Sequence, residues 1–205
     1  MKIIAVGMNY AAHNKELHEN EPRPQDPVIF LKPDSALLKD GKPFFIPDFS
    51  NDVQYETELV VRICRLGKNI AQRFSYRYYD AVTVGIDFTA RDLQRASRAV
   101  GGPWALCKGF DGSAVVGDFV ELKPEDDIQQ MHFHLNIDGQ TVQSGFAGDM
   151  LFTVDRIIAY VSQFMTLKIG DLLYTGTPAG VGPVHIDQHL QGYLEGEKVL
   201  DFHVR

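Results

Sequence analysis

Residues 53–61 read Val-Gln-Tyr-Glu-Thr-Glu-Leu-Val-Val, and this stretch decides what kind of fold the chain adopts. Aromatic, β-branched and apolar residues are interrupted by acidic residues at alternate positions, the pattern of a half-buried strand. Because strand side chains alternate between faces, Glu56 and Glu58 share one face and the odd-numbered residues share the other. The stretch therefore predicts a strand that carries two carboxylates side by side.

Short strands separated by turn signals account for most of the remaining chain. The predicted strands span residues 26–33, 41–47, 53–64, 81–88, 116–122 and 131–137. Asp138-Gly139 predicts a two-residue hairpin after the last of them, because a type I′ turn needs positive φ at both central positions. The predicted fold class is mainly β with a few short helices.

Three segments depart from the strand pattern and are predicted to be helical. The first spans residues 10–17, with Asn9 as its N-cap. The second begins at Thr89, has Asp92 as a capping-box-like partner, and ends before a Gly-Gly-Pro sequence. The third spans residues 154–164 and carries one apolar stripe. No repeat or linker divides the 205 residues, so we expect a single domain over residues 1–205.

Composition restricts the classes of function. Hydrophobic residues at 44%, charged residues at 23% and a mean hydropathy of -0.15 are typical of a soluble globular protein without a membrane-spanning helix. The net charge of -7 disfavours nucleic acid as a partner. Cys64 and Cys107 are too few for a disulfide framework, and the N-terminus shows no export signal, so we expect a cytoplasmic protein.

The paired acids suggest a metal site. Strand geometry puts the Glu56 and Glu58 side chains about 6.5 Å apart, where ionised carboxylates repel unless a cation, a proton or water intervenes. A solvated strand face is the alternative for this pair alone. Asp87 ends the largely apolar run of residues 81–86, where a buried acid needs a partner. If the three acids converge, their all-oxygen donor set suits Mg²⁺, with Mn²⁺ or Ca²⁺ as alternatives.

Ordered motifs over nearly the whole chain resemble those of the fumarylacetoacetate hydrolase family, in its short core-domain subgroup. In chain order they are GMNYAAHNKEL from Gly7, VIFLKP from Val28, YETEL from Tyr55, GIDFTARDLQ from Gly85, WALCKGF from Trp104, SGFAGDMLFTV from Ser144 and MTLKIGDLLYTGTPAGVGP from Met165. The resemblance implies a mixed β-sandwich roll, assembled as a homodimer, in which Glu56, Glu58 and Asp87 bind a divalent metal.

The resemblance also assigns the catalytic residues. It implies that His13 and Glu16, which a helix places on one face at i and i+3, form a catalytic pair. Taken alone, a histidine near the N-terminus is more often a solvated surface residue. Lys108 resembles the family's site lysine and would stabilise a developing oxyanion, the alternative being an ordinary surface lysine.

Three further residues are candidates for substrate binding. Arg91 and Gln94 share a helical face just after Asp87 and would clamp a substrate carboxylate, unless Arg91 belongs to an exposed basic helix face. Thr177 lies in a Gly-rich loop that would bring backbone amides and a hydroxyl to an anionic substrate.

Met8 is a departure from the family pattern, because many members have arginine at this place. Methionine supplies neither charge nor strong hydrogen bonds. The acyl end of the substrate is therefore expected to be less polar or to be held by other residues.

Together these features predict metal-dependent hydrolysis of a carbon-carbon bond in a small 2-oxo acid, an acylpyruvate or a fumarylpyruvate-like acid. His13, oriented by Glu16, would deprotonate the attacking water, and the metal with Lys108 would stabilise the pyruvate enolate. Isomerisation of 2-hydroxyhepta-2,4-diene-1,7-dioate and decarboxylation of oxaloacetate give the same enolate and stay open. A non-catalytic module that binds a small carboxylate through a cation is the alternative from another class.

Overall fold

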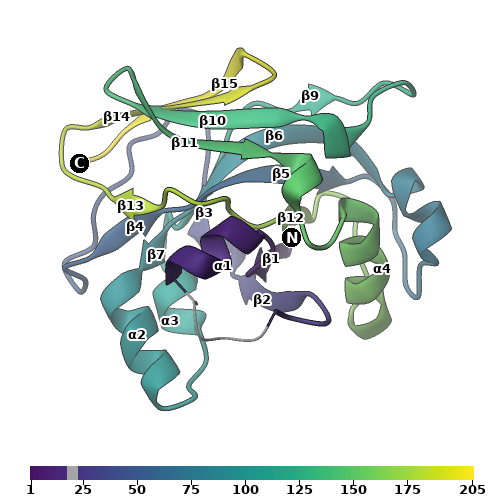
Figure 1. Cartoon of the computed structure of the whole chain (residues 1–205), viewed down its shortest axis with the longest axis horizontal. Coiled ribbons are helices and arrows are strands. Elements are labelled where there is room, and N and C mark those ends of the chain that lie inside the picture. Colours follow the sequence, from purple (N-terminus) through teal and green to yellow (C-terminus); the bar gives the residue numbers. More distant parts are fainter. Residues whose placement is uncertain (18–22) are drawn as a thin grey trace.

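A computed structural model describes residues 1–17 and 23–205. In these ranges the strands are β1 (Ile3–Gly7), β2 (Val28–Lys32), β3 (Leu37–Leu38), β4 (Val53–Tyr55), β5 (Thr57–Ile63), β6 (Tyr79–Asp87), β7 (Thr89–Ala90), β8 (Ala114–Val116), β9 (Val120–Glu121), β10 (His132–Ile137), β11 (Gln140–Phe146), β12 (Leu172–Tyr174), β13 (Gly182–Pro183), β14 (His189–Leu194) and β15 (Glu197–His203). The α-helices are α1 (Ala11–Leu17), α2 (Arg91–Ala99), α3 (Ala105–Lys108) and α4 (Val154–Phe164). The predicted class, mainly β with a few short helices, is confirmed (Figure 1).

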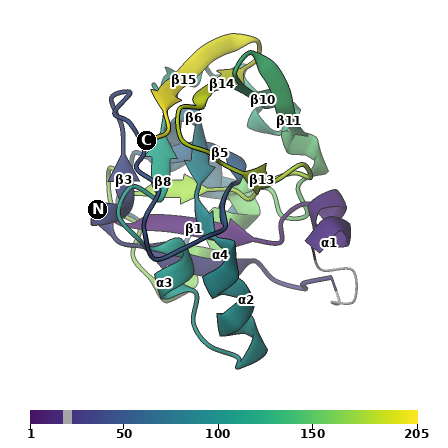
Figure 2. The same ribbon diagram turned by 90° about the vertical axis from the view of Figure 1, so that its left-hand side faces the viewer.

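The strands form one large sheet and two smaller sheets. Within the described residues, the large sheet has the order β2-β1-β12-β5-β6-β8-β3, and β9 pairs with β6. The second sheet has the order β11-β10-β14-β15, and the third has the order β13-β4-β7. Figures 1 and 2 show the second sheet lying over β5 and β6 of the large sheet. The large sheet is thus covered on this face by other strands.

The main apolar core lies between the large sheet and the second sheet. Leu59 of β5 and Val84 of β6 belong to the same buried cluster as Phe133 of β10 and Leu190 of β14. All four side chains are at most 2% exposed. Burying each contributes roughly 1.5–3 kcal/mol relative to leaving it in water. The period-two pattern of β5 and β6 therefore fixes which face of each strand packs against the second sheet.

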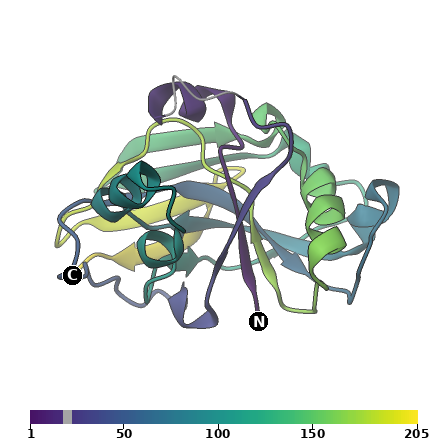
Figure 3. The ribbon, with the colours of Figure 1, turned by 90° about the horizontal axis from the view of Figure 1, so that it is seen from below.

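The opposite face of β5 and β6 carries the acids. Glu58 pairs directly with Gly85, and the backbone amide of Asp87 donates to the Glu56 carbonyl at 2.8 Å. Antiparallel register thus brings the end of β6 beside the start of β5. On this side of the molecule, α2 and α3 lie to one side of β1 and β2, and α4 lies to the other (Figure 3).

The strand predictions are confirmed in part. Asp138 and Gly139 adopt φ of 50° and 79°, and they join β10 to β11 as the hairpin predicts. The strand predicted over residues 41–47 is wrong, since this segment has only an isolated bridge between Phe44 and Val204. Phe44 instead stacks on Phe88 with ring centroids 3.9 Å apart. Aromatic packing, rather than strand pairing, explains the apolar residues of this loop.

The helix at residues 154–164 is confirmed, and Thr153 caps it by accepting a hydrogen bond from the Arg156 amide. The first helix is also present, but Asn9 is not its cap. The Asn9 amide nitrogen donates to the carbonyls of Phe152 and Thr175, and its oxygen accepts from the Phe152 amide at 2.8 Å. Asn9 therefore ties the N-terminal segment to two distant segments of the chain.

The second helix begins two residues later than the sequence predicts. Thr89 lies in β7, and its hydroxyl donates to the Asp87 carbonyl. Asp92 accepts hydrogen bonds from the Ser50 hydroxyl and the Leu93 amide, so the predicted capping box is wrong. The third sheet takes up residues that the local pattern assigned to the helix.

Among the helices of residues 1–17 and 23–205, none combines the length and apolar character needed to cross a bilayer.

Replacing Gly85 by alanine is expected to lower the melting temperature. A Cβ at this position would stand 2.7 Å from the Val115 carbonyl oxygen and 2.9 Å from Cε1 of Tyr174. Overpacking of this kind costs about 1–3 kcal/mol of unfolding free energy. Thermal unfolding of the variant beside the wild type measures the loss, and an unchanged melting temperature would contradict the close packing around Gly85.

Candidate active site

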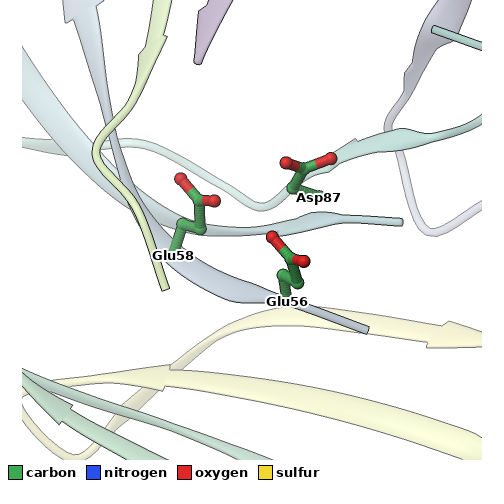
Figure 4. Close-up of side chains that lie close together, drawn as sticks. All are labelled: Glu56, Glu58 and Asp87. Carbon is green, nitrogen blue, oxygen red and sulfur yellow. The ribbon is translucent and has the colours of Figure 1, made fainter. Parts of the chain in front are cut away.

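Three buried carboxylates converge at the junction of β4, β5 and β6 (Figure 4). Glu56 lies between β4 and β5, Glu58 lies in β5, and Asp87 ends β6; they are 6%, 1% and 0% exposed. One oxygen of each lies within 4.8 Å of an oxygen of the others. The carboxylates point into a common space in Figure 4. The convergence that the metal hypothesis requires is therefore present, and the acids are not a solvated strand face.

Two buried lysines compensate part of this negative charge. The Lys108 ammonium donates to Glu56 Oε2 at 2.8 Å and to Asp87 Oδ2 at 2.7 Å. The Lys32 ammonium lies 2.5 Å from Asp87 Oδ1 and donates to the Ser113 carbonyl. Both lysines are 2% exposed, so Lys108 is not a surface lysine. Asp87 is thus held between two ammonium groups.

Arg91 connects α2 to the carboxylate cluster. Its Nη2 donates to Glu56 Oε1 at 2.7 Å, its Nη1 donates to Gln94 Oε1 at 2.6 Å, and its Nε donates to Gln54 Oε1 at 3.0 Å. Arg91 and Gln94 are 6% and 5% exposed, so the alternative of an exposed basic helix face does not hold for Arg91. The two side chains are bonded to each other, and three of the five N–H groups of Arg91 position neighbouring residues.

The two glutamates have opposite pKa shifts. Burial raises the pKa of Glu56, but the charges of Lys108, Arg91 and His13 lower it by more. The pKa of Glu56 therefore lies well below its ordinary value. Burial, then Asp87 and Glu56, raise the pKa of Glu58 well above its ordinary value. A hydrogen bond from the Gly176 amide at 2.6 Å offsets this rise only in part.

This asymmetry agrees with a site for a hard cation. Among the described residues, Lys108 and Arg91 make ion pairs with Glu56, whereas Glu58 accepts its hydrogen bond from a neutral amide. A divalent cation would supply the positive charge that Glu58 needs in order to ionise when buried. Carboxylate oxygens are the ligands that Mg²⁺, Mn²⁺ and Ca²⁺ prefer. The donor set therefore fits the predicted metal.

His13 lies beside this cluster rather than on the surface. It is 4% exposed, lies on α1, and lines a small pocket together with Glu56, Arg91 and Lys108. The reading of His13 as a solvated histidine is therefore wrong. Glu16 lies in the same helix, but its side chain lies outside the described part of the structure. The His13–Glu16 pair thus stays a prediction from their i, i+3 spacing.

Thr177 lines the same pocket, but its hydroxyl is already used. It donates to the Thr57 carbonyl at 2.9 Å and accepts from Gln143 Nε2 at 2.8 Å. Gln143 also accepts a hydrogen bond from the Thr57 amide at 3.0 Å. The Thr177 side chain and Gln143 thus hold the loop that carries Gly176 against the start of β5.

Gln143 was not identified from the sequence. It is 3% exposed on β11, between the exposed Ser144 and the half-buried Val142. A long polar residue at an inward position of a predicted hairpin strand is the available signal, because a buried amide must find partners. Its partners lie 34 or more positions away in the chain, so local pattern does not reveal them.

Replacing Gln143 by alanine is expected to weaken metal binding and destabilise the fold. The change leaves the buried Thr57 amide without its acceptor, which costs about 1–3 kcal/mol of unfolding free energy. It also frees the loop whose Gly176 amide donates to Glu58. Calorimetric titration with Mn²⁺ and urea unfolding check both effects, with the exposed Gln140 of the same strand replaced by alanine as the control. Wild-type Mn²⁺ affinity in the Gln143 variant would contradict this positioning role.

Comparison with known proteins identifies the family of this chain. The family described as "Fumarylacetoacetate (FAA) hydrolase C-terminal" matches residues 2–204. Oxaloacetate tautomerase FAHD1, mitochondrial, from Arabidopsis thaliana is 38% identical over 203 residues, covering 99% of this chain and 90% of that protein. Oxaloacetate decarboxylase, mitochondrial, from Dictyostelium discoideum is 38% identical over 196 residues, covering 95% of this chain and 89% of that protein.

The fold comparison agrees. The crystal structure of fumarylpyruvate hydrolase from Pseudomonas aeruginosa in complex with Mn²⁺ and pyruvate superposes with a TM-score of 0.91 at 32% identity. That comparison covers 100% of this chain and 89% of the other. It confirms the predicted β-sandwich roll, and the motif resemblance is confirmed by the match over residues 2–204. The chain belongs to the fumarylacetoacetate hydrolase family and is one of its enzymes.

Proposed function

We propose that the protein hydrolyses a carbon-carbon bond in small 2-oxo acids of the acylpyruvate class. The reaction would use a bound divalent cation, with Mg²⁺ as the first candidate. The observation that carries the proposal is the buried cluster of Glu56, Glu58 and Asp87, whose Glu56 lines the same pocket as His13. We further propose that residues 1–205 act as one catalytic domain, in a cytoplasmic homodimer. The enzymes among its relatives argue against a non-catalytic carboxylate-binding module.

Glu56, Glu58 and Asp87 would hold the cation, which when bound supplies Lewis-acid polarisation of the substrate's oxygens. Lys108 and Arg91 favour the ionised form of Glu56, as its lowered pKa indicates. These two cations also remain close to any negative charge that develops on the substrate. Arg91 and Lys108 thus have a positioning role and an electrostatic role at the same site.

His13 is the group proposed to activate water. With the substrate in the pocket, neutral imidazole takes a proton from water, and the hydroxide formed attacks the distal carbonyl of the acylpyruvate. The carbon-carbon bond then breaks, the acyl group leaves as a carboxylic acid, and the electron pair stays on the pyruvate fragment as an enolate. Protonation of that enolate gives pyruvate. Glu16, on the same helical face, would orient the imidazole.

Oxaloacetate chemistry is the second candidate, favoured by the names of the two relatives from Arabidopsis and Dictyostelium. Tautomerisation and decarboxylation of oxaloacetate also pass through an enolate, but neither consumes an activated water. Isomerisation of a 2-hydroxydienedioate likewise consumes no activated water.

A side-by-side product assay separates these reactions. The purified Mg²⁺-loaded protein is supplied with acetylpyruvate and, separately, with oxaloacetate. Pyruvate, acetate, carbon dioxide and the rate of enol-keto exchange of oxaloacetate are measured. Equal amounts of acetate and pyruvate from acetylpyruvate support the hydrolase. Carbon dioxide or enol-keto exchange from oxaloacetate, with acetylpyruvate unchanged, would replace it by the second candidate.

A further inference from the structure

The pocket around His13 is polar on one part of its surface and apolar on the other. The polar part contains Glu56, Arg91 and Lys108, and both cations donate to Glu56. Gln94 and Thr177 also line the polar part, and an apolar wall is made by Val6, Gly7, Met8, Phe30 and Trp104. This apolar wall comes from the end of β1, the middle of β2 and the residue before α3.

The aromatic part of this wall is closely packed. The rings of Phe30 and Trp104 meet edge to face, with centroids 5.5 Å apart and an interplanar angle of 69°. A Cβ at Gly7 would stand 3.1 Å from Cζ3 of Trp104, so the indole ring lies against the β1 backbone. The Lys108 ammonium lies 5.2 Å from the centroid of the Phe30 ring, where the polar and apolar parts meet.

Met8 occupies a costly backbone conformation in this wall. Its φ is 62°, in the left-handed region that glycine adopts freely and that costs other residues about 1–2 kcal/mol. Its carbonyl accepts a hydrogen bond from Asn14 Nδ2 at 2.9 Å. A long apolar side chain at such a position, in a pocket wall, points to a role for the side chain itself.

We propose that Met8 selects substrates whose end remote from the 2-oxo acid is apolar and uncharged. The inference rests on the proposed function, since it assumes that the 2-oxo acid end binds at the carboxylate cluster. Among the described residues that line the pocket, Arg91 and Lys108 already pair with Glu56, and the proposed function uses His13 as a neutral base. A second carboxylate against the apolar wall would lose its water without gaining a cation. An alkyl group there would gain from burial.

Two isosteric ligands test this selectivity without turnover. 2-Oxoglutarate ends in a carboxylate, and 5-methyl-2-oxohexanoate has an isopropyl group in its place; neither contains the bond that the enzyme would cleave. Calorimetric titration of the Mn²⁺-loaded protein is expected to show at least about tenfold tighter binding of 5-methyl-2-oxohexanoate. In the Met8→Arg variant the preference is expected to reverse, because the guanidinium would pair with the carboxylate.

Two further variants separate selectivity from structure. Met8→Leu keeps an apolar side chain and is expected to keep the preference for the isopropyl ligand. Met8→Gly is expected to lose most of that preference without a lower melting temperature, because glycine adopts this φ without strain. A merely structural role for Met8 would lower the melting temperature of the glycine variant and leave the ligand preference unchanged, which would overturn the proposal.

Acetylpyruvate hydrolysis, run on the same preparations, distinguishes the two levels of failure. If the wild type cleaves acetylpyruvate but binds 2-oxoglutarate as tightly as its apolar isostere, the Met8 proposal is wrong and the proposed function stands. If the Mn²⁺-loaded protein binds neither ligand and cleaves no acylpyruvate, the proposed function is wrong and the Met8 proposal is overturned with it.

Discussion

Replacing His13 by alanine is expected to lower kcat for acylpyruvate hydrolysis by about 10²–10⁴-fold, the usual contribution of a general base. The physical reason is its place, because the imidazole is 4% exposed and lines the same pocket as Glu56 of the carboxylate cluster. Mn²⁺ affinity is expected to stay near the wild-type value, because the metal hypothesis assigns no ligand atom to His13. Steady-state kinetics of pyruvate release and calorimetric Mn²⁺ titration measure the two quantities.

The exposed His185 provides the matched control, since replacing it by alanine removes an imidazole that does not line the pocket. This variant is expected to keep wild-type kcat. Oxaloacetate decarboxylation, if the wild type shows it, is expected to survive in the His13 variant, because that reaction needs no activated water. Full hydrolase activity of a folded His13→Ala protein would show that the base assignment is wrong.

Replacing Lys108 by methionine is expected to destabilise the metal-free protein by about 3–5 kcal/mol, the typical cost of removing one partner of a buried ion pair. Its ammonium bridges Glu56 and Asp87, and all three side chains are buried. Methionine preserves most of the side-chain volume, so the loss reports charge rather than packing. Urea unfolding measures the difference, and saturating Mn²⁺ is expected to recover part of it because bound cation compensates the same carboxylates.

Lys198 supplies the control for this prediction. It makes a surface ion pair with Asp201 at 2.5 Å, and its side chain is 44% exposed. Solvent screens surface pairs, so Lys198→Met is expected to change the unfolding free energy little. Equal stabilities of the Lys108 and Lys198 variants, with and without Mn²⁺, would contradict an ionised carboxylate cluster.

Much of the site was accessible from residue pattern because its parts are short and periodic. Alternation over residues 53–61 placed Glu56 and Glu58 on one face, and an acid at the end of an apolar run singled out Asp87. Turn chemistry identified the hairpin at Asp138-Gly139, where both residues have positive φ. In each case a local rule of backbone geometry carries the information.

Other features depend on partners far away in the chain. Lys32 follows an apolar strand sequence without a local sign that Asp87, 55 positions later, would pair with it. Asn9 has the residue type of a helix cap, but it bonds to segments more than 140 positions away. Tertiary hydrogen bonds of this kind override local preference, because a buried amide or ammonium must be satisfied wherever its partner lies.

The same reason explains the revised view of the substrate clamp. Helical spacing correctly puts Arg91 and Gln94 together, which are bonded to each other. It does not reveal that Arg91 also donates to Glu56 and Gln54. Arg91 thus serves first to position a predicted metal ligand. Two of its five N–H groups lie outside these three hydrogen bonds.

Metal-dependent pyruvate release is the measurement that tests the account most directly. Acetylpyruvate is supplied to the Mg²⁺-loaded protein, to the same protein after chelator treatment with its metal content verified, and to the treated protein after Mg²⁺ is added back. The account predicts that release is lost with the metal and restored with it, while the protein remains folded throughout. Undiminished release from the verified metal-free protein would contradict the central claim.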